Sequence, residues 1–316
     1  MKVLVLGASS FIGRNFLLGC PKQWKVYGTY NKDKDFLHFL KQNKLGNAKA
    51  FQCNLLEQDS VKKLFQQIND FDAVLFLVAN LSIPMSFKNP YSDLRMNTLT
   101  LLHVLSEVRC KKFIYFSSGA VYDGIKGKVN PAVAVNPKIP YALSKLASEH
   151  YVEFYSKQGN IGSYINVRFF GAYGHYELSR KVYSKIIDEF VVRKKSSFDV
   201  YGNGKNLIDA MYVDDAVRAI VLMMQSKKGN MALDLCIGKP LTIDSLVIEA
   251  GKILTNKEIK INHIGKTFEP VSFIGSAKEM KNHFGFTPQI GLKEGLLRLK
   301  SFIIKGNYTR KSNYEN

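Results

Sequence analysis

The sequence has 316 residues, 46% of them hydrophobic, which is enough for one large domain or two unequal ones with an ample core. No window approaches eighteen consecutive apolar residues and no signal-peptide pattern is present, so we expect a cytoplasmic protein with no membrane span. The net charge of +19 admits anionic partners, but 36 of the 45 basic residues are lysines spread along the chain without aromatic interleaving, and we expect no nucleic-acid surface.

Short apolar runs alternate with amphipathic stretches over the first 170 residues. The apolar runs predict strands at 1–6, 25–30, 48–52, 73–78, 112–117 and 163–169. The amphipathic stretches predict helices at 36–42, 61–68, 94–108 and 141–155. Such alternation is typical of an α/β fold, here a Rossmann-type doubly wound parallel sheet.

The first strand runs directly into a glycine turn, Gly7 to Gly13 (GASSFIG), which is followed by a helical pattern. Strand, tight turn and helix in this order direct a helix N-terminus at a phosphate group, so the stretch is a candidate dinucleotide site. Gly7 permits the tight turn and Gly13 permits close packing of helix on strand, while Ser10 stands where a middle glycine is expected. The alternative is an ordinary connecting turn of an α/β protein.

The alternation ends after Gly174, where helices are predicted at 182–192, 244–254 and 292–303 around a turn-rich segment at 201–205. We expect residues 1–170 to form a dinucleotide-binding domain, to which a segment of about 206–238 returns. Residues 171–316 are expected to form mainly a second, smaller C-terminal substrate domain, with a polar tail from Lys305 that frays. No metal site or disulfide is expected, because metal-like spacing is missing among the four cysteines, Cys20, Cys53, Cys110 and Cys236.

Tyr141 and Lys145 lie four residues apart after Pro140, a residue suited to the first turn of a helix, so their side chains share one helical face. The same spacing of tyrosine and lysine occurs three more times, but at a strand end or in glycine turns. Ser118 follows the predicted strand at 112–117, and ligands of open α/β sheets bind at the carboxyl ends of strands. We therefore expect Ser118 to meet Tyr141.

This trio suits hydride-transfer chemistry at a carbinol carbon. A tyrosine, with an ordinary pKa of about 10, accepts the hydroxyl proton only if its phenolate is stabilised. We expect the Lys145 ammonium and a cationic nicotinamide to stabilise it; a pKa lowered by about three units corresponds to about 4 kcal/mol. Ser118 would hydrogen-bond the reacting oxygen. In the alternative interpretation Tyr141 only begins a helix and Lys145 is a surface charge.

Further motifs accompany the trio along almost the whole chain: Asn97 in the predicted helix at 94–108, and the segments 116–122, 168–174 (RFFGAYG), 201–215 (YGNGKNLIDAMYVDD), 286–288 and 292–296. Together with the glycine turn, they resemble the extended short-chain dehydrogenase/reductases, the NAD(P)-dependent nucleotide-sugar epimerase/dehydratase family. The resemblance implies an oxidoreductase or epimerase that acts on a nucleotide-linked sugar, and commonly a homodimer formed through the helices that bear Asn97 and Tyr141.

The resemblance also implies roles for single residues. Tyr141 is the expected acid/base, Lys145 also holds the nicotinamide ribose, and Ser118 orients the substrate hydroxyl. The residues expected to contact the cofactor are Gly7, Ser9, Ser10, Phe11, Ile12, Gly13, Arg14, Asn31, Lys32, Asn54, Leu55, Val78, Ala79, Asn97, Tyr141, Lys145 and Phe169. Those expected to contact the substrate, a small molecule, are Ser118, Gly119, Ala120, Gly171, Arg180 and Lys181.

The chain departs from the family's pattern where the family holds the nucleotide diphosphate. Ile208 stands where an arginine is usual, Gly171 where an asparagine is usual, and the arginine and aspartate expected near residue 275 are missing. Replacement cations could come from Arg180, Lys181 or Lys266, unless these are solvated charges.

A second departure concerns the type of reaction. Family members that expel water carry an acidic pair after the strand-end serine or threonine. Gly119 and Ala120 occupy those two positions here, and neither can transfer a proton. We therefore do not expect dehydration of the sugar.

The end of the second predicted strand bears on the choice of cofactor. A carboxylate there normally accepts the adenine-ribose hydroxyls of NAD, and the tip at Tyr30 and Asn31 carries none. Arg14 and Lys32 could both approach a 2′-phosphate through charge-assisted hydrogen bonds. NADP is therefore the expected cofactor, with NAD as the alternative if Asp33 lies at the strand tip.

Three functions are consistent with the sequence. The first is an epimerase or reductase of a nucleotide-linked sugar. The second is an NADPH-dependent reductase of a non-nucleotide carbonyl substrate, which Ile208 and Gly171 favour. The third is a non-catalytic cofactor-sensing or nucleic-acid-binding module, against which stands the complete set of Ser118, Tyr141 and Lys145.

Overall fold

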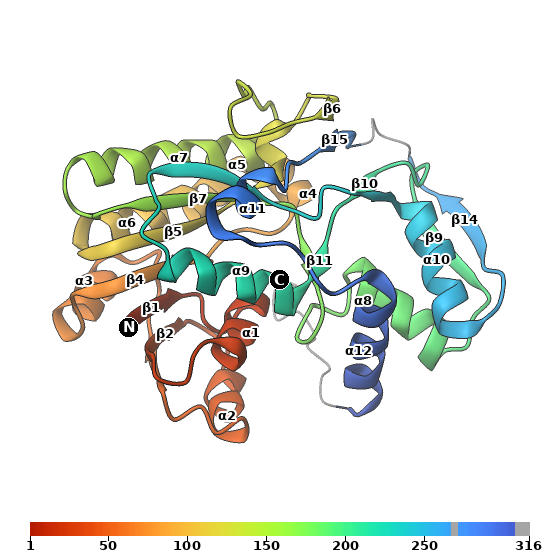
Figure 1. Ribbon diagram of the computed structural model, residues 1–316, viewed down its shortest axis with the longest axis horizontal. Helices are drawn as coiled ribbons and strands as arrows, with labels where there is room; N and C mark the ends of the chain where they lie inside the picture. The colour runs from red at the N-terminus through yellow and green to blue at the C-terminus, as the bar shows by residue number, and fades with distance from the viewer. Residues whose placement is uncertain (267–270, 307–316) are drawn as a thin grey trace.

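The computed structural model describes residues 1–266 and 271–306. A parallel sheet of seven strands in the order β12-β7-β5-β4-β1-β2-β3 forms its centre (Figure 1). These strands are β1 (Lys2–Leu6), β2 (Lys25–Tyr30), β3 (Ala48–Gln52), β4 (Phe71–Phe76), β5 (Cys110–Ser118), β7 (Tyr164–Phe169) and β12 (Met231–Leu235). The predicted Rossmann-type fold class is confirmed, and most of the predicted tail lies outside the described residues.

Helices cover both faces of this sheet. One face packs against α1 (Phe11–Gly19), α2 (Asp35–Gln42) and α9 (Val213–Gln225). The other packs against α3 (Gln58–Gln67), α6 (Thr100–Glu107) and α7 (Pro140–Lys157). Within β1, Val3 and Val5 face the first core and Leu4 and Leu6 face the second, as expected of a strand buried on both sides. No helix among the described residues is long and apolar enough to span a membrane.

The chain crosses between two lobes more than once. The strand β12, from the second half of the sequence, pairs in parallel with β7 at the edge of the sheet. Helix α9, which precedes β12, packs against α1. The sequence analysis predicts no helix at 213–225, although its buried residues recur at helical spacing. Division of the chain at residue 170 stays a prediction, since the lobes are interleaved in sequence.

The smaller lobe lies at the right of Figure 1. Its helices are α8 (Val182–Ile187), a π-helical turn η3 (Asp188–Val192), α10 (Ile243–Thr255) and α12 (Leu292–Ile304). Its strands are β9 (Ser197–Tyr201), β10 (Leu207–Ile208), β13 (Leu241–Thr242) and β14 (Lys260–Ile264), in two pairs, β14 with β9 and β10 with β13.

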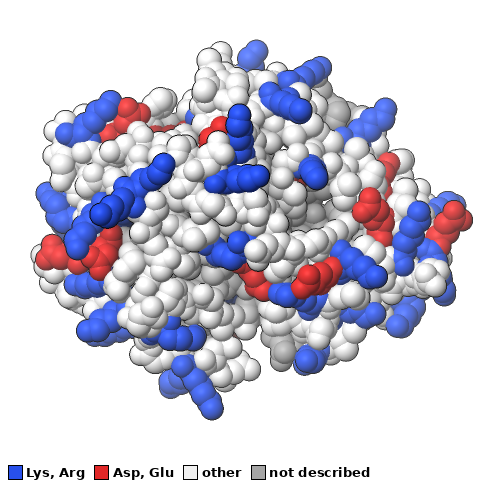
Figure 2. Space-filling model, in the orientation of Figure 1, with Lys and Arg blue, Asp and Glu red and all other residues white. Residues whose placement is uncertain are grey.

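Short elements connect the lobes and border the sheet. They are α4 (Ile83–Lys88), α5 (Pro90–Leu94), a π-helical turn η1 (Arg95–Leu99), a 3₁₀ turn η2 (Gly119–Tyr122), β6 (Gly127–Lys128), β8 (Ala172–Tyr173), β11 (Met211–Tyr212), β15 (Phe273–Ile274) and α11 (Lys278–Phe284). The helix predicted at 94–108 is therefore split by η1, which periodicity alone does not reveal. On the face in Figure 2, lysine and arginine side chains are scattered among acidic ones, so that face carries no single basic patch.

Candidate functional site

The glycine turn after β1 has the geometry that its sequence predicts. Gly7 has φ +86°, and the Ser10 hydroxyl accepts a hydrogen bond from the Gly13 N–H at 3.1 Å, which caps α1. A β-carbon at Gly13 would lie 2.6 Å from the carbonyl oxygens of Gly7 and Ala8, so no other residue fits there. The start of α1 is thus held against the end of β1, where a Rossmann fold receives a pyrophosphate.

The other candidate cofactor residues follow neighbouring strands along the same edge of the sheet. Strands β4, β1, β2 and β3 are adjacent, so the segments after them meet there: Val78 and Ala79, Gly7 to Arg14, Asn31 and Lys32, and Asn54 and Leu55. The Asn31 amide donates to the Asn54 side-chain oxygen at 3.4 Å. Asn97, in η1, accepts the Asn80 backbone N–H at 2.8 Å and so holds the loop after β4. At the end of β7, Phe169 packs on Phe116.

The position of the Arg14 side chain differs from the one expected of a 2′-phosphate ligand. Its side chain is only 5% exposed, and its guanidinium donates to the Asp33 carboxylate at 2.9 Å and to the Ser9 carbonyl at 3.1 Å. The guanidinium also lies over the Phe39 ring, 4.7 Å from its centroid. Because a carboxylate already neutralises this cation, Arg14 is not the free 2′-phosphate ligand that the sequence analysis expects. Lys32 is exposed.

Ser118, Tyr141 and Lys145 come from two elements that pack together. Ser118 ends β5 and is half-buried, and its hydroxyl accepts the Ala120 N–H at 3.1 Å. Tyr141 and Lys145 lie in the first turns of α7, and both side chains are buried. The Ser118 side chain lies close enough to the Tyr141 phenol to lower the pKa of the phenol, against the rise that burial causes. Ser118 and Tyr141 thus lie near each other at the end of β5, and their roles stay predictions.

The protonation of this pair differs from the expectation. Burial raises the pKa of Tyr141, and the nearby Ser118 side chain offsets this rise only in part. Burial also lowers the pKa of Lys145 to about 7, although the charges of Asp93 and Glu149 oppose this shift. The Lys145 ammonium donates to the Phe116 carbonyl at 2.7 Å and lies over the Tyr115 ring. Lys145 is thus held against β5 through the Phe116 carbonyl.

A network of buried polar side chains next to β5 is not predicted from the sequence. Glu149 accepts hydrogen bonds from the Arg168 guanidinium at 2.9 to 3.3 Å and from the Ser117 hydroxyl. Arg168 also donates to the Tyr122 hydroxyl at 3.1 Å, which donates to Asp234 at 2.7 Å. Glu149 follows Lys145 by four residues, so its place on the same helical face could have been predicted, whereas the pairing with Arg168 depends on the sheet.

Gly119, one of the candidate substrate residues, lies against the ring of Phe170, which follows β7. A β-carbon at Gly119 would lie 3.1 Å from three Phe170 ring carbons, and one at Gly275 would lie 2.4 Å from the ring. Gly171 has φ +140°, a conformation that a residue with a side chain rarely adopts. Acidic or basic side chains at 119 and 275 are therefore incompatible with this position of the ring.

The remaining candidate substrate residues lie in two places. Ala120 is half-buried in η2, and Arg180 and Lys181 are exposed just before α8. Ile208 is half-buried in β10, and the Asp209 carboxylate beside it accepts the backbone N–H groups of Ile237 and Gly238. Asp209 therefore fixes the loop after β12.

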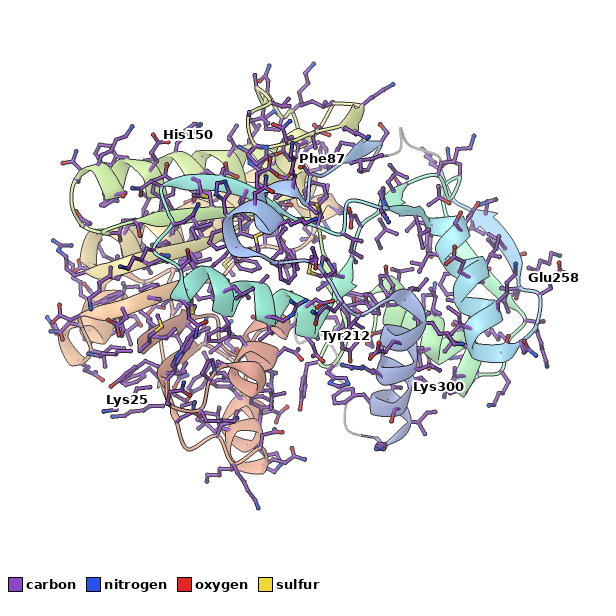
Figure 3. All side chains as sticks on the ribbon, in the orientation of Figure 1. Lys25, Phe87, His150, Tyr212, Glu258 and Lys300 are labelled. Carbon is purple, nitrogen blue, oxygen red and sulfur yellow. The ribbon has the colours of Figure 1, made fainter. Side chains whose placement is uncertain are left out.

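The loop after β8 links α1 to the smaller lobe. Asn15, in α1, donates from its side-chain amide to the His175 carbonyl at 2.7 Å. The His175 ring is hydrogen-bonded to the Tyr212 hydroxyl at 3.1 Å and stacks on Phe302 of α12. Figure 3 shows Tyr212 where α9 and α12 approach each other. Helix α1, which follows the glycine turn, is thus linked to α12 of the smaller lobe through the loop after β8.

Known proteins of similar sequence and fold include nucleotide-sugar dehydratases and epimerases. The sequence is 28% identical to a dTDP-D-glucose 4,6-dehydratase of Dictyostelium discoideum, over 80% of this chain and 61% of that protein. It is 27% identical to the human dTDP-D-glucose 4,6-dehydratase, over 93% of this chain and 87% of that protein. Among solved structures, a UDP-glucuronic acid 4-epimerase from Bacillus cereus, in complex with UDP-glucuronic acid and NAD, superposes with a TM-score of 0.84 at 23% identity. The superposition covers 98% of this chain and all of the epimerase.

The sequence model of the NAD dependent epimerase/dehydratase family matches residues 3–237, about three quarters of the chain. The matched range holds the glycine turn, Ser118, Tyr141, Lys145 and the segment 201–215. The predicted resemblance is thereby confirmed: this protein belongs to the NAD-dependent epimerase/dehydratase family of enzymes.

Proposed function

We propose that the protein oxidises and re-reduces one carbinol carbon of a nucleotide-linked sugar, as an epimerase with Tyr141 as its acid/base. The observation that carries this proposal is the joint burial of Tyr141 and Lys145 beside Ser118, at the carboxyl end of β5. This is the edge of the sheet at which ligands of such folds bind. The Bacillus cereus epimerase of the same fold was solved with a nucleotide sugar and NAD.

Each residue of the trio has a defined task in this reaction. With its own proton released beforehand, as a phenolate, the Tyr141 oxygen takes the proton of the sugar hydroxyl as the carbinol becomes a ketone, and returns that proton when the ketone is reduced. Ser118 orients the sugar oxygen toward Tyr141. Lys145, when protonated, would add positive charge that favours the phenolate form of Tyr141. The turn at Gly7 to Gly13 fits NAD, because a β-carbon at Gly13 would fill it, and NAD when bound would take up and return the hydride.

We further propose that the reaction stops short of dehydration. Loss of water requires a proton donor and a base beside the strand-end serine, and Gly119 and Ala120 supply neither. The Phe170 ring occupies the space that a side chain at 119 would need. The product is therefore an epimer of the substrate and retains all its hydroxyl groups.

Product analysis tests both proposals. The purified protein would be incubated with NAD and a panel of UDP- and dTDP-linked hexoses, hexosamines and hexuronic acids, and the products separated and identified by NMR. We expect an equilibrium mixture of two epimers of one nucleotide sugar. A 4-keto-6-deoxy product would contradict the exclusion of dehydration. If no nucleotide sugar of the panel reacts, the epimerase proposal fails.

A second candidate function is reduction of a carbonyl compound that carries no nucleotide. The observation that favours it is the loss of the usual diphosphate contacts, because Ile208, Gly171 and Gly275 offer no cation or amide. For a nucleotide sugar, the exposed Arg180 and Lys181 would have to bind the diphosphate. An Arg180→Ala/Lys181→Ala variant separates the two functions: its KM for a nucleotide sugar should rise at least about tenfold. An unchanged KM would favour the second function.

We propose that the cofactor is NAD, in place of the NADP that the sequence analysis predicts. The Asp33 carboxylate lies just after β2 and engages Arg14, so this strand end carries an acid and lacks a free arginine. A carboxylate at this place favours ribose hydroxyls and repels a 2′-phosphate. We also propose the domain assignment expected from the sequence. Residues 1–170, together with about 206–238, would bind NAD, and the remaining residues would mainly bind substrate.

Titration of the protein with both cofactors tests this choice. We expect NAD to bind at least about tenfold more tightly than NADP, and Asp33→Ser to reduce that ratio. Asp35→Ser, an exposed carboxylate two residues further along, is the matched control and should leave the ratio unchanged. Tighter binding of NADP to the unaltered protein would restore the original prediction.

We propose a homodimer and activity in the cytoplasm, as the sequence analysis expects. The interface expected from the sequence is formed by the helices that bear Asn97 and Tyr141; we propose that it is formed by α7, which bears Tyr141, together with α4 and α5, which precede Asn97 in the chain. The outer faces of these helices expose large apolar side chains, among them Phe87 at 59% and Tyr91 at 69% exposure. Tyr151 and Phe154 continue the surface along α7, where they border a shallow hollow with His150. Figure 3 labels Phe87 and His150 on this side of the molecule. A patch of this kind is typical of a surface that a second chain covers.

Analytical ultracentrifugation tests the dimer. Tyr151→Glu/Phe154→Glu places two charges on the α7 face and should convert the dimer to a monomer. Leu297→Glu on α12, where the leucine is similarly exposed, is the control and should leave the mass unchanged. A monomer at micromolar concentration in the unaltered protein would contradict the proposal.

A further inference from the structure

Asp93 is a buried carboxylate that no part of the proposed reaction has yet used. It lies in α5 and is 2% exposed. One of its oxygens accepts hydrogen bonds from the side-chain amides of Asn80, at 2.6 Å, and Asn97, at 3.1 Å. The other accepts the Ser144 hydroxyl at 2.7 Å. An isolated buried charge is costly, so a site that surrounds one with three donors is built to keep it.

The three donors belong to the segments that form the candidate site. Asn80 follows Val78 and Ala79 in the loop after β4, and its backbone N–H is held by the Asn97 side chain at 2.8 Å. Ser144 lies between Tyr141 and Lys145 in α7, and its hydroxyl also accepts the Asn97 amide at 2.8 Å. Asp93 therefore connects the loop after β4, the π-helical turn η1 and the start of α7 through one network of hydrogen bonds.

We propose that Asp93 is a positioning residue of the reaction: through Ser144 and Asn97 it fixes Tyr141 and Lys145 relative to the loop after β4, and its charge acts on both. This proposal rests on the proposed function of Tyr141. Asp93 acts through its neighbours, because both of its carboxylate oxygens are engaged by Asn80, Asn97 and Ser144.

The charge of Asp93 has a definite sign of effect on its neighbours. A negative charge favours the protonated form of each nearby group, so it raises the pKa of Tyr141 in addition to burial, and opposes the fall that burial causes in the pKa of Lys145. The other ionisable groups that face this region are Tyr115 of β5 and Glu149 of α7, whose charge is paired with Arg168 of β7. With those unchanged, removal of the Asp93 charge should lower the pKa of Tyr141.

Two variants separate the charge from the positioning contact. Asp93→Asn removes the charge and keeps the shape, whereas Ser144→Ala removes one link to α7 and keeps the charge. Tyr141 would be titrated by ultraviolet difference spectroscopy with NAD bound, using Tyr141→Phe as the blank. Turnover would be measured on the nucleotide sugar identified above, and folding checked by urea unfolding. Asp123→Asn, a carboxylate in the loop after η2 whose side chain accepts the Lys138 N–H, is the control.

We expect Asp93→Asn to shift the Tyr141 titration down by about one pH unit. Ser144→Ala should leave that titration unchanged and lower kcat by about ten- to a hundredfold, because misplacement of an acid/base by a fraction of an ångström is costly. A folded Asp93→Asn protein in which Tyr141 titrates as before overturns the proposal. An unchanged kcat in Ser144→Ala overturns it as well. If Asp93→Asn does not fold, the kcat of Ser144→Ala alone tests the proposal. If the unaltered protein shows no turnover, the proposed function is rejected. The effect of the Asp93 charge on Tyr141 is still tested in that case, because the titration needs no substrate.

Discussion

The Glu149–Arg168 pair offers a sharp test of how the site is supported. Both side chains are about 5% exposed, and Glu149 receives three contacts from the guanidinium at 2.9 to 3.3 Å. Glu149→Gln keeps the shape but removes the negative charge, which leaves Arg168 buried with the Tyr122 hydroxyl and one amide oxygen as acceptors. Removing one partner of a buried ion pair costs about 3–5 kcal/mol, so we expect the free energy of unfolding to fall by that amount.

Urea unfolding followed by circular dichroism measures this loss. Glu153→Gln, one turn further along α7, breaks an exposed pair with Lys157 and should produce no measurable change. A Glu149→Gln/Arg168→Met double variant, which removes both charges, should be more stable than Glu149→Gln alone. A loss of less than about 1 kcal/mol in Glu149→Gln, or a double variant weaker than the single one, would refute the reasoning.

Two further predictions concern buried lysines. Lys112, in β5, donates to the carbonyl oxygens of Met223, Ser226 and Lys228 at and just after the end of α9. Lys112→Met should therefore lower the free energy of unfolding, measured in urea, by about 1–3 kcal/mol. An unchanged free energy of unfolding would show that water satisfies these carbonyls. Burial lowers the pKa of Lys145 from 10.5 to about 7, so the unfolded chain binds more protons between these values and stability should rise with pH across that window. Lys145→Met should reduce this rise between pH 7 and pH 9, and an equal rise in both proteins would contradict the assigned pKa.

The sequence predicts the layered core well, because buried parallel strands and amphipathic helices leave periodic signatures. The predicted bounds of β2 and β3 agree with the structure, and β4 is displaced by two residues. Helix α9 was missed although Val213, Val217 and Ile220 recur at helical spacing, a signal that was available in the sequence. The π-helical turn at η1 leaves no periodic signature of its own.

Contacts between distant segments account for most of the remaining differences. Arg14 and Asp33 are far apart in the chain and form a pair only because α1 and the end of β2 meet at the sheet edge. The depth of Tyr141 and Lys145, which sets the direction of both pKa shifts, likewise depends on packing of α7 on β5. The sequence could place these residue types near one site, but it could not show which charges neutralise one another there.

The central claim is that Tyr141 transfers the proton in an NAD-dependent reaction on a nucleotide sugar. The most direct test is the turnover of Tyr141→Phe, measured beside its NAD affinity and its urea unfolding curve. The substitution removes one oxygen from a buried ring, so we expect the fold and NAD binding to persist while kcat falls by about 10²–10⁴-fold. A Tyr141→Phe protein that binds NAD and turns over within about tenfold of the unaltered enzyme would contradict the account.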